Sequence, residues 1–599
     1  MSIQEHTTSY FLALSPTHGE TVLSHYQTLR NDKLLCDIVL VAEGTEFNAH
    51  KSLLACASDY FRSMFKDYTR ESKASVVYLH MVSATGLQHV LDFIYNSCLA
   101  LSLETLPQTL ETASYLQVLE AVRLCSHYLV SSLSPGSCCQ AANVAARFAL
   151  SEAQRRAEGY IALNLWRLLA AGVEESGLME LNLESLQVVL QSEQVPRLKE
   201  AALLSLALEW LSRDQCRWAQ ADLLLPHIRY GLIPRAELQR LSSDPRGHLL
   251  ERAGARQLIT RALDYHRAES RQPVLQSRQS TLRNPERQLL AVGGVSLQQG
   301  ASSVLWALNP RTREWSSVSQ GPAIQNHCVC VLGNFLFVLG GEELQAGGDP
   351  RKEEGLAISN RVHRYDPRFN TWSRVASMLS RRAQFSCCVL DDCIFALGGR
   401  CGLQASLAAV EVYDVNSGRW DKVRKLPHKM QGHACAVHND TIYISGGKYA
   451  EQPDASKEMF SFHPLQAEWK RCPPMTIARF GHQMATVGDS IFSFVGMYEP
   501  FCDIEYYDPL HKQWQRLRPL LFDRSCYGLA VMDANVYLVG GKKWHNSHEV
   551  AAQSAVMYDP NTDTWREVCK LPLPLCGTQC AVLHLPDLPE AEGKLELHN

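Results

Sequence analysis

The sequence predicts a multidomain protein with a mixed α/β domain, then an all-α domain, then an all-β six-bladed propeller. Three observations carry this prediction. Helix and strand patterns alternate near the start of the 599 residues, helical stripes without strands follow, and a strand-rich unit repeats six times in the C-terminal half. A chain of this length needs more than one core.

Composition narrows the class of protein. The chain is 46% hydrophobic and 20% charged, with a formal net charge of −4, which gives no basic field for nucleic acid or an anionic membrane. The apolar run Tyr10 to Leu14 is too short for a signal peptide, and Ala201 to Leu211 is too short to span a bilayer. We therefore expect a cytoplasmic protein, with access to the nucleus left open, that binds no membrane and no nucleic acid.

The 20 cysteines lack the spacing of a metal site. The closest pairs are Cys138-Cys139, Cys387-Cys388 and Cys328-x-Cys330. Zinc sites need Cys-x-x-Cys pairs with matching histidines. We therefore expect no metal and no cofactor, and reduced thiols that pack as small apolar side chains. A redox-sensing thiol is left open.

The first segment, 1–133, is expected to be the mixed α/β domain. Val22, Tyr26 and Leu29 share one stripe of the first helix, and His50 has a structural role because no second metal ligand is near it. The expected elements are a helix over 18–32, strands over 36–42 and 45–49, a helical run ending near 65, a strand over 76–79 and a helix capped by Ser83.

Residues 134–270 are expected to be all-α. Stripes such as Ile161, Leu165 and Leu168 recur at helical spacing and are separated by Gly, Pro or Asn. Residues 271–285, rich in Arg, Ser and Gln, are interpreted as a polar linker.

A repeat of glycines and tryptophans defines the C-terminal half. Glycine doublets end apolar strands at Gly293-Gly294, Gly340-Gly341, Gly398-Gly399, Gly446-Gly447 and Gly540-Gly541, with a degenerate sixth copy at Gly496-Met497. Tryptophans follow at Trp315, Trp372, Trp420, Trp469, Trp514 and Trp565, each seven residues after an apolar or aromatic residue. One such unit cannot bury both faces, so the six must stack in a ring.

The two ends of this repeat predict how the ring closes. Residues 287–294 supply a glycine-ended strand with no first strand before it, and residues 578–585 supply a first strand with no doublet after it. The C-terminal strand therefore completes the N-terminal blade and leaves no open edge. The propeller is assigned to 286–590, and 591–599 are expected to be a disordered tail.

Motifs in all three parts resemble the kelch-like family of BTB-BACK-kelch adaptors. The BTB (POZ) resemblance rests on Cys36 to Leu40, Phe47 to Lys51 and Leu91 to Tyr95, and the BACK resemblance on Trp210 and Arg229 to Pro234. It implies a homodimer through the first helix and a non-catalytic adaptor. Such an adaptor binds cullin-3 and brings a substrate protein to a RING E3 ubiquitin ligase.

The resemblance also places the cullin contact. Family members use a hydrophobic-x-Glu motif after the helical run that ends here near Phe65, and this motif aligns with Thr69, Arg70 and Glu71. Threonine stands at the apolar position, which would cost about 1–3 kcal/mol of contact. The other interpretation is a solvated loop, and whether cullin-3 binds despite Thr69 is left open.

The family binds its substrates on the propeller face formed by the loops that follow the doublets and precede the first strands. Here these loops offer Arg382, Arg400, Lys448, Arg479, Phe480, Tyr498, Arg524, Ser525, Tyr527, Lys542 and Trp544. Cations interleaved with aromatic rings suit an acidic peptide segment of an unknown protein. Arg479 and Arg524 occupy equivalent repeat positions, so a role in holding loops together is the alternative. For the loop 342–359, mobility and recognition are both left open.

Two other functions compete with the adaptor. Some kelch propellers are copper oxidases, but the 22 histidines here scatter without a spaced pair and the glycine doublets end strands. We therefore expect no enzyme. A dimeric scaffold that binds actin or other cytoskeletal filaments would use the same architecture. The sequence decides neither between scaffold and adaptor nor the identity of the substrate, its tissue or its regulation.

Overall fold

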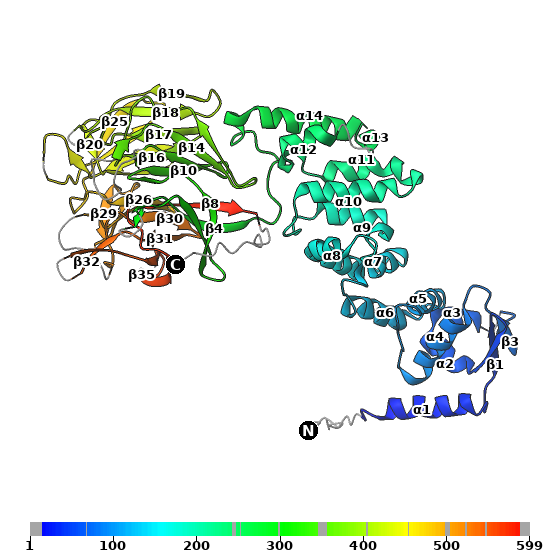
Figure 1. Ribbon diagram of the computed structural model, residues 1–599. Helices are drawn as coiled ribbons and strands as arrows, with labels where there is room; N and C mark the ends of the chain where they lie inside the picture. The colour runs from blue at the N-terminus through cyan, green and yellow to red at the C-terminus, as the bar shows by residue number, and fades with distance from the viewer. Residues whose placement is uncertain are drawn as a thin grey trace, which may run out of the picture. The chain divides into compact units, whose positions relative to one another are not determined.

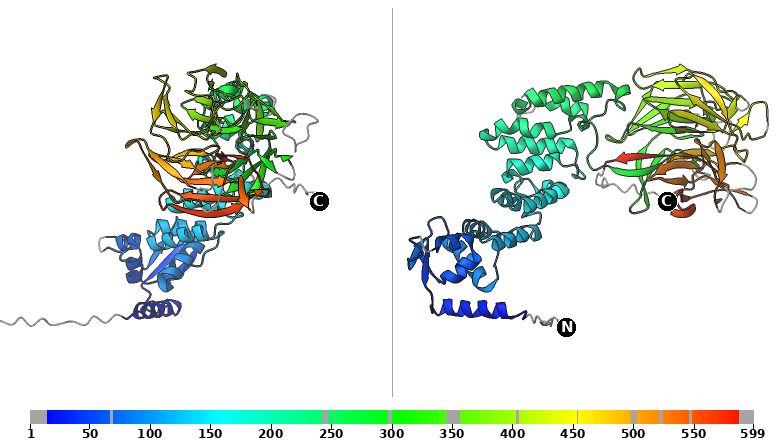
Figure 2. Two further views of the ribbon diagram at one scale, coloured as in Figure 1. Left: turned by 90° about the vertical axis from the view of Figure 1, so that its left-hand side faces the viewer. Right: turned by 180° about the vertical axis from the view of Figure 1, so that it is seen from behind.

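The computed structural model describes residues 15–66, 69–241, 247–251, 253–296, 300–344, 356–402, 405–452, 454–497, 503–520, 524–545 and 548–586 (Figures 1 and 2). The chain forms two compact units, Met1–Pro196 with Glu209–His227, and Arg197–Leu208 with Ile228–Asn599. The expected tail at 591–599 and most of the 342–359 loop lie outside the described residues. Within those residues, no helix combines the length and the apolar character that crossing a bilayer requires.

The first unit opens with the expected mixed α/β domain. Its sheet has the order β2-β1-β3, in which β1 pairs antiparallel with β2 and parallel with β3. The strands are β1 (Ile38–Ala42), β2 (Thr45–Ala49) and β3 (Val76–Tyr78), and the helices are α1 (His18–Asn31), α2 (Lys51–Ala57), α3 (Asp59–Met64), α4 (Ala84–Asn96), α5 (Leu106–Tyr115) and α6 (Leu119–Ser131). The core includes Leu40, Phe61, Leu87 and Leu91.

The helical run expected to end near Phe65 is two helices. Ser58 has an extended backbone between α2 and α3, and its Oγ accepts a hydrogen bond from Phe61 N–H, which starts α3. The same hydroxyl donates to Leu116 O at 2.5 Å. His50 is buried, and its backbone N–H and its Nδ1 both contact the Tyr95 hydroxyl, at 2.9 and 2.8 Å. It therefore has the structural role expected from the sequence.

Helices continue through the middle of the chain, as expected. Ile161, Leu165 and Leu168 are buried on one face of α8, and Trp210 Nε1 donates to Leu181 O at 3.0 Å. The helices are α7 (Cys138–Arg147), α8 (Ser151–Ala171), α9 (Leu183–Gln191), α10 (Glu200–Ser212), α11 (Ala221–Leu224), α12 (Arg235–Arg240), α13 (Gly247–Leu250) and α14 (Ala253–Arg267).

The described residues of the second unit contain six four-stranded antiparallel sheets, the blades of a propeller. From first to fourth strand, the first blade is β36 (Gln579–Leu585), β4 (Glu286–Val292), β7 (Val304–Asn309) and β8 (Glu314–Gln320), and the second is β10 (Cys328–Leu332), β11 (Phe335–Leu339), β14 (Val362–Asp366) and β15 (Thr371–Val375). The third blade is β16 (Ser386–Leu390), β17 (Cys393–Leu397), β18 (Val410–Asp414) and β19 (Arg419–Lys422), and the fourth is β21 (Ala434–His438), β22 (Thr441–Ser445), β24 (Met459–His463) and β25 (Glu468–Cys472). The fifth blade is β26 (Gln483–Val487), β27 (Ser490–Phe494), β28 (Glu505–Asp508) and β29 (Gln513–Arg516), and the sixth is β30 (Gly528–Met532), β31 (Asn535–Val539), β34 (Ser554–Asp559) and β35 (Thr564–Lys570).

Short strand pairs lie between the blades in sequence. They are β5 (Val295–Ser296) with β6 (Gly300–Ala301), β12 (Glu342–Leu344) with β9 (Ile324–Gln325) and β13 (Leu356–Ile358), β20 (Met430–Gln431) with β23 (Lys448–Tyr449), and β32 (Lys542–His545) with β33 (His548–Ala551).

The ring closes as predicted. The C-terminal strand β36 pairs antiparallel with β4 from Gln579↔Val292 to Leu585↔Glu286. The first strands of neighbouring blades contact one another in the order β36, β10, β16, β21, β26, β30 and back to β36. The predicted six-bladed all-β propeller is confirmed, and the ring has no free sheet edge at its closure.

Glycine follows the second strand in five of the six blades, because a Cβ there would come too close to the next blade. A Cβ on Gly398, whose φ is +56°, would lie 2.8 Å from Cε1 of His433 in the next blade. The sixth copy needs a correction of one residue. Val495 has φ +24°, and a Cβ on Gly496 would meet Phe480 O and His482 Cβ, as one on Gly447 would meet Gln431 O and His433 Cβ. The degenerate doublet is therefore Val495-Gly496, and Gly496-Met497 was wrong.

The interpretation of 271–285 as a linker needs correction as well. Arg283 and Glu200 form a buried ion pair at 2.5 Å, and the Tyr230 N–H donates to Gln279 Oε1 at 3.0 Å. Ser280 is buried and its carbonyl accepts from Arg368 at 3.3 Å. These polar side chains satisfy buried partners, so this segment is a packed part of the second unit.

Candidate functional site

Backbone hydrogen bonds link neighbouring blades at the residues that precede their first strands, at the mouth of the propeller channel. Just before each first strand stands a residue with positive φ: Asn326, Gln384, Gly432, Gly481, Cys526 and Gly577. Gln384 N–H donates to Asn326 O at 3.0 Å, Gly432 N–H to Gln384 O at 2.8 Å, and Gly481 N–H to Gly432 O at 2.7 Å. These bonds link consecutive blades and hold the mouth in a defined shape.

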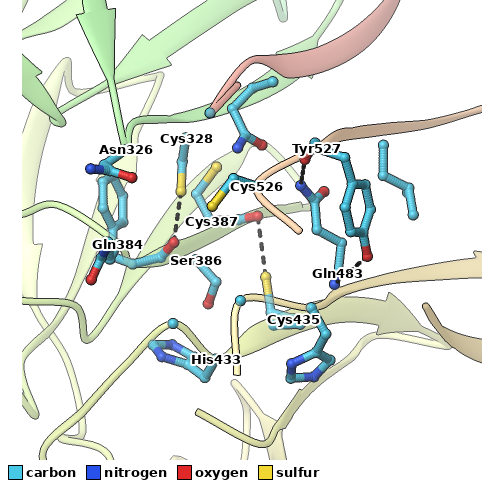
Figure 3. Close-up of a pocket in the computed structure, with 18 of the residues that line it drawn as sticks. Asn326, Cys328, Gln384, Ser386, Cys387, His433, Cys435, Gln483, Cys526 and Tyr527 are labelled. Carbon is cyan, nitrogen blue, oxygen red and sulfur yellow. Dashed lines mark hydrogen bonds between the residues drawn. The ribbon is translucent and has the colours of Figure 1, made fainter. Parts of the chain in front are cut away.

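A cavity of about 270 Å³ lies at this mouth (Figure 3). Asn326, Gln384 and Gln483 supply amide groups to its lining, and Phe480 and Met497 supply apolar surface. The inner strands add thiols to the lining, those of Cys328, Cys387 and Cys435. Of this lining, the sequence singled out Phe480 and Tyr527 as candidate substrate contacts, but none of the amide-bearing residues. The only signal for those was their position just before or inside a first strand.

Arg382 does not face a substrate. Its side chain is fully buried, its Nη2 lies 2.7 Å from Glu411 Oε1, and its Nη1 donates to Gly398 O at 3.0 Å. The guanidinium group therefore ties the end of one strand to the glycine doublet within its own blade. Its assignment as a substrate contact is corrected, because a buried, paired cation is not available to a partner.

Arg479 and Arg524 occupy the same place in two other blades and are also buried. Arg479 pairs with Glu505 at 3.2 Å and donates to Val495 O at 3.1 Å. Arg524 Nη1 donates to Ser554 O at 3.1 Å. The structure thus favours the alternative that these arginines hold loops together, and their assignment to substrate binding is corrected.

Two further candidate cations, Arg400 and Lys448, contact other side chains of the same chain. Arg400 forms an ion pair with Glu342, which also accepts from Gln325 Nε2 at 3.0 Å and Asn326 Nδ2 at 2.9 Å. Lys448 Nζ lies 4.9 Å from the centre of the Phe480 ring. The first contact neutralises Arg400, which weakens the argument for an acidic peptide.

The remaining candidates also differ in how deeply they are buried. Tyr527 is buried, and its hydroxyl donates to Phe494 O at 2.7 Å, so it belongs to the core between blades. Ser525 and Lys542 are half-buried and exchange two backbone hydrogen bonds, at 3.0 and 2.7 Å. Tyr498 and the side chain of Trp544 lie outside the described residues. Arg400, Lys448, Phe480, Ser525 and Lys542 stay predicted substrate contacts.

The cullin motif lies in the loop after α3. Thr69 is half-buried, and its Oγ1 lies 2.5 Å from Met64 O and 2.8 Å from Lys66 O. The same oxygen accepts from Ser72 N–H at 3.2 Å. Arg70 and Glu71 are exposed. The threonine hydroxyl therefore closes the turn after α3, while the charged residues of the motif face solvent.

Metal chemistry finds no support in the described part of the chain, where no group of three or more His, Cys, Asp or Glu side chains is placed to hold a metal ion. Three imidazoles near the cavity, those of His327, His433 and His482, are fully buried instead. Burial lowers the pKa of His327 and of His433 to about 4. They are therefore neutral at physiological pH and pack between blades.

Similarity to known proteins extends over nearly the whole chain. Family models match as a BTB/POZ domain over residues 26–133, as BACK (BTB And C-terminal Kelch) over 138–243, and as a KLHDC2/KLHL20/DRC7 Kelch-repeats domain over 258–447 and 408–584. The chain is 42% identical to Kelch-like protein 34 of Homo sapiens over 98% of both chains.

Two further relatives match over most of the chain. Kelch-like protein 36 of Bos taurus is 33% identical over 96% of this chain and 93% of its own length, and Kelch-like protein 9 of Mus musculus is 34% identical over 98% and 95%. With the three domains in this order and a closed six-bladed ring, the chain belongs to the kelch-like family of BTB-BACK-kelch proteins.

Proposed function

We propose that this chain is a non-catalytic substrate adaptor of a cullin-3 RING ubiquitin ligase in the cytoplasm. The BTB and BACK domains bind the cullin, and the propeller binds the substrate protein at its channel mouth. The observation that supports the proposal is that one chain combines two features. Its BTB domain has Glu71 exposed to solvent after α3, and its closed propeller has a polar cavity at its mouth.

We expect the cullin contact to be weakened at Thr69, and the conformation of this residue gives the reason. Thr69 directs its hydroxyl to the carbonyls of Met64 and Lys66, so the loop presents no apolar side chain at the position where the family inserts one. The missing contact is worth about 1–3 kcal/mol. We expect cullin-3 binding that relies on Glu71 and neighbouring surface and is weaker than that of relatives with an apolar residue there.

Substitution of Thr69 tests the cullin contact. Thr69→Met adds the apolar contact, and we expect the affinity of the full-length chain for the cullin-3 N-terminal domain to rise about five- to hundred-fold, as measured by calorimetry. Thr69→Val is the matched control, because it also removes the hydroxyl that closes the turn but adds little reach. The absence of saturable binding by both the wild type and Thr69→Met would contradict the adaptor proposal. Cosedimentation with actin filaments in that case would favour a cytoskeletal scaffold.

The proposed substrate contact uses only part of the set of residues that the sequence predicted. The half-buried residues Lys448, Phe480, Ser525 and Lys542 remain as proposed substrate contacts, near a cavity with neutral amides on its wall. Arg400 serves mainly to satisfy Glu342, so Arg400→Glu would place two carboxylates together and disturb the loop itself. Lys448→Ala is the cleaner probe of substrate capture, because it removes a cation that lies over the Phe480 ring and leaves the ion pair of Arg400 with Glu342 in place.

A further inference from the structure

The first strands of three neighbouring blades carry a group of thiols that the proposed adaptor function does not use. Cys328 and Cys330 lie on β10, Cys387 on β16 and Cys435 on β21, and all four are free cysteines. Cys328, Cys387 and Cys435 line the channel cavity, and Figure 3 shows their sulfur atoms around it. A small reagent that enters the cavity therefore meets thiols from adjacent blades.

Hydrogen bonds place the Cys387 thiol beside β10, at the residue between Cys328 and Cys330. Cys387 Sγ donates to Val329 O at 3.3 Å, and Cys328 Sγ donates to Phe385 O at 2.9 Å. Val329 separates Cys328 from Cys330, whose side chains lie on the same face of β10 because side chains alternate along a strand. Cys328 belongs to a buried apolar cluster against which both Cys330 and Cys387 pack, so the three thiols share one neighbourhood.

This arrangement favours oxidation chemistry at one of the three thiols. Hydrogen bonds from the thiols of Cys328 and Cys330 lower the pKa of Cys387, whereas burial raises the pKa of Cys328. The thiolate is the nucleophilic form of cysteine, and a sulfenic acid condenses with a thiol beside it. Cys387 thus combines easier ionisation with adjacent partners.

We propose that Cys387 is an oxidation site for a small hydroperoxide that enters the channel cavity, with Cys328 or Cys330 as the resolving thiol. The Cys387 thiol attacks hydrogen peroxide, the O–O bond breaks, and the products are a sulfenic acid and water. The β10 thiol then attacks the sulfenic sulfur, so that an S–S bond forms and a second water leaves. Two thiols lose two electrons, and one peroxide is reduced to two waters.

The product would be a disulfide between the first strands of two neighbouring blades. Such a bond restricts the unfolded chain and raises the melting temperature of the propeller. The site depends neither on cullin-3 nor on a substrate, because every group in it belongs to the inner strands. Its failure would leave the adaptor proposal untouched.

Peptide mapping of the full-length protein tests the proposal. The protein is treated with hydrogen peroxide, denatured with iodoacetamide and digested with trypsin without reduction. Trypsin places Cys328 and Cys330 in peptide 314–351, Cys387 with Cys388 and Cys393 in peptide 383–400, and Cys435 in peptide 430–448. We expect a cross-linked pair of peptides 314–351 and 383–400 that a reducing agent separates.

The neighbouring cysteine supplies a matched control. Cys388 lies on the opposite face of β16, where its thiol reaches Cys435. Cys387→Ser is expected to lose the cross-link completely and Cys388→Ser to keep it, with both reduced variants melting as the wild type does. The proposal is overturned if Cys387→Ser keeps the cross-link. It is overturned equally if Cys387 stays unmodified at peroxide doses that oxidise the exposed Cys56 and Cys401.

Discussion

His327, His433 and His482 precede the first strands of three blades, and each imidazole faces the glycine doublet of the blade before it. A Cβ on Gly293 would lie 2.6 Å from His327 Cε1, and one on Gly446 would lie 2.5 Å from His482 Cε1. The first glycine of a doublet therefore makes room for a side chain of the next blade. Removing these rings from water is what lowers their pKa values.

Buried neutral histidines predict a loss of stability in mild acid. The pKa of His433 is about 4 in the folded chain against 6.5 for the unperturbed side chain. Below pH 6.5 the unfolded chain binds a proton that the folded chain does not, so the free energy of unfolding falls as the pH decreases. At pH 5 the loss is about 2 kcal/mol per histidine.

His433→Phe tests this prediction, because Phe385 fills the equivalent place in the preceding blade. We expect the melting temperature of the full chain, measured by calorimetry, to fall less between pH 7 and pH 5 in the variant than in the wild type. Equal falls in the two proteins would show that His433 does not contribute.

Arg382 predicts the cost of an unpaired buried charge. Arg382→Met leaves Glu411 buried without its cation, and we expect a loss of about 3–5 kcal/mol in the free energy of unfolding measured with urea. Met430 occupies the place of Arg382 in the next blade, and Val556 occupies the place of Glu411 in another. The double variant Arg382→Met/Glu411→Val should therefore recover most of the loss. An unchanged free energy of unfolding in the single variant would contradict a stabilising role for the buried pair.

Strand β36 shows what one element contributes to the ring. It pairs along its whole length with β4, and it buries Ala581, Leu583 and Leu585 between the first blade and its neighbours. Without it, β4 becomes a free edge strand with its apolar face uncovered. The stability of the ring therefore depends on the last described strand of the chain.

Truncation separates the role of β36 from that of the residues after it. A chain ending at 578 loses β36, and we expect it to aggregate or to lose the cooperative melting transition of the propeller. A chain ending at 586 keeps β36 and should melt as the full chain does. Thermal scanning and limited proteolysis measure both, and a cooperative transition in the shorter chain would contradict closure by this strand.

The assembly proposed for the whole molecule is a homodimer, and α1 is the element that supports it. None of the residues of α1 is buried, and Val22 on its apolar stripe is 39% exposed. Just beyond the helix, Leu34 and Leu35 are 54% and 80% exposed. Tyr26 on the same stripe packs against the core of its own domain, whereas Val22 is uncovered and gains free energy when a second copy covers it.

Light scattering after gel filtration tests the dimer. The wild type should have twice the 67.1 kDa mass of one chain, and Val22→Asp should shift it toward one mass by placing a charge in the apolar contact. Thr21→Asp is the control, because Thr21 is also exposed on α1 but lies off the stripe. A dimer that survives Val22→Asp and dissociates with Thr21→Asp would place the interface on another face.

Local pattern determined most of the architecture. Doublets, tryptophans and the unmatched strands at the two ends predicted six blades and their closure, because each blade obeys the same steric and burial rules. The error of one residue at Val495-Gly496 arose because a valine holds the positive φ that glycine holds elsewhere. The helical run through Ser58 divided because one hydroxyl caps α3, which spacing alone does not reveal.

Only the tertiary structure decided which of the candidate cations and rings are buried and paired within the chain. Arg382, Arg479 and Arg524 stand in loops that the sequence suggests are exposed. In the structure each of them turns inward and donates to backbone carbonyls of its own blade. The thiols of Cys328 and Cys387 are 59 residues apart in the sequence, and ring closure sets them on adjacent strands. The sequence by itself determined the ring, because repetition is local, whereas burial and pairing depend on neighbours that only the closed ring supplies.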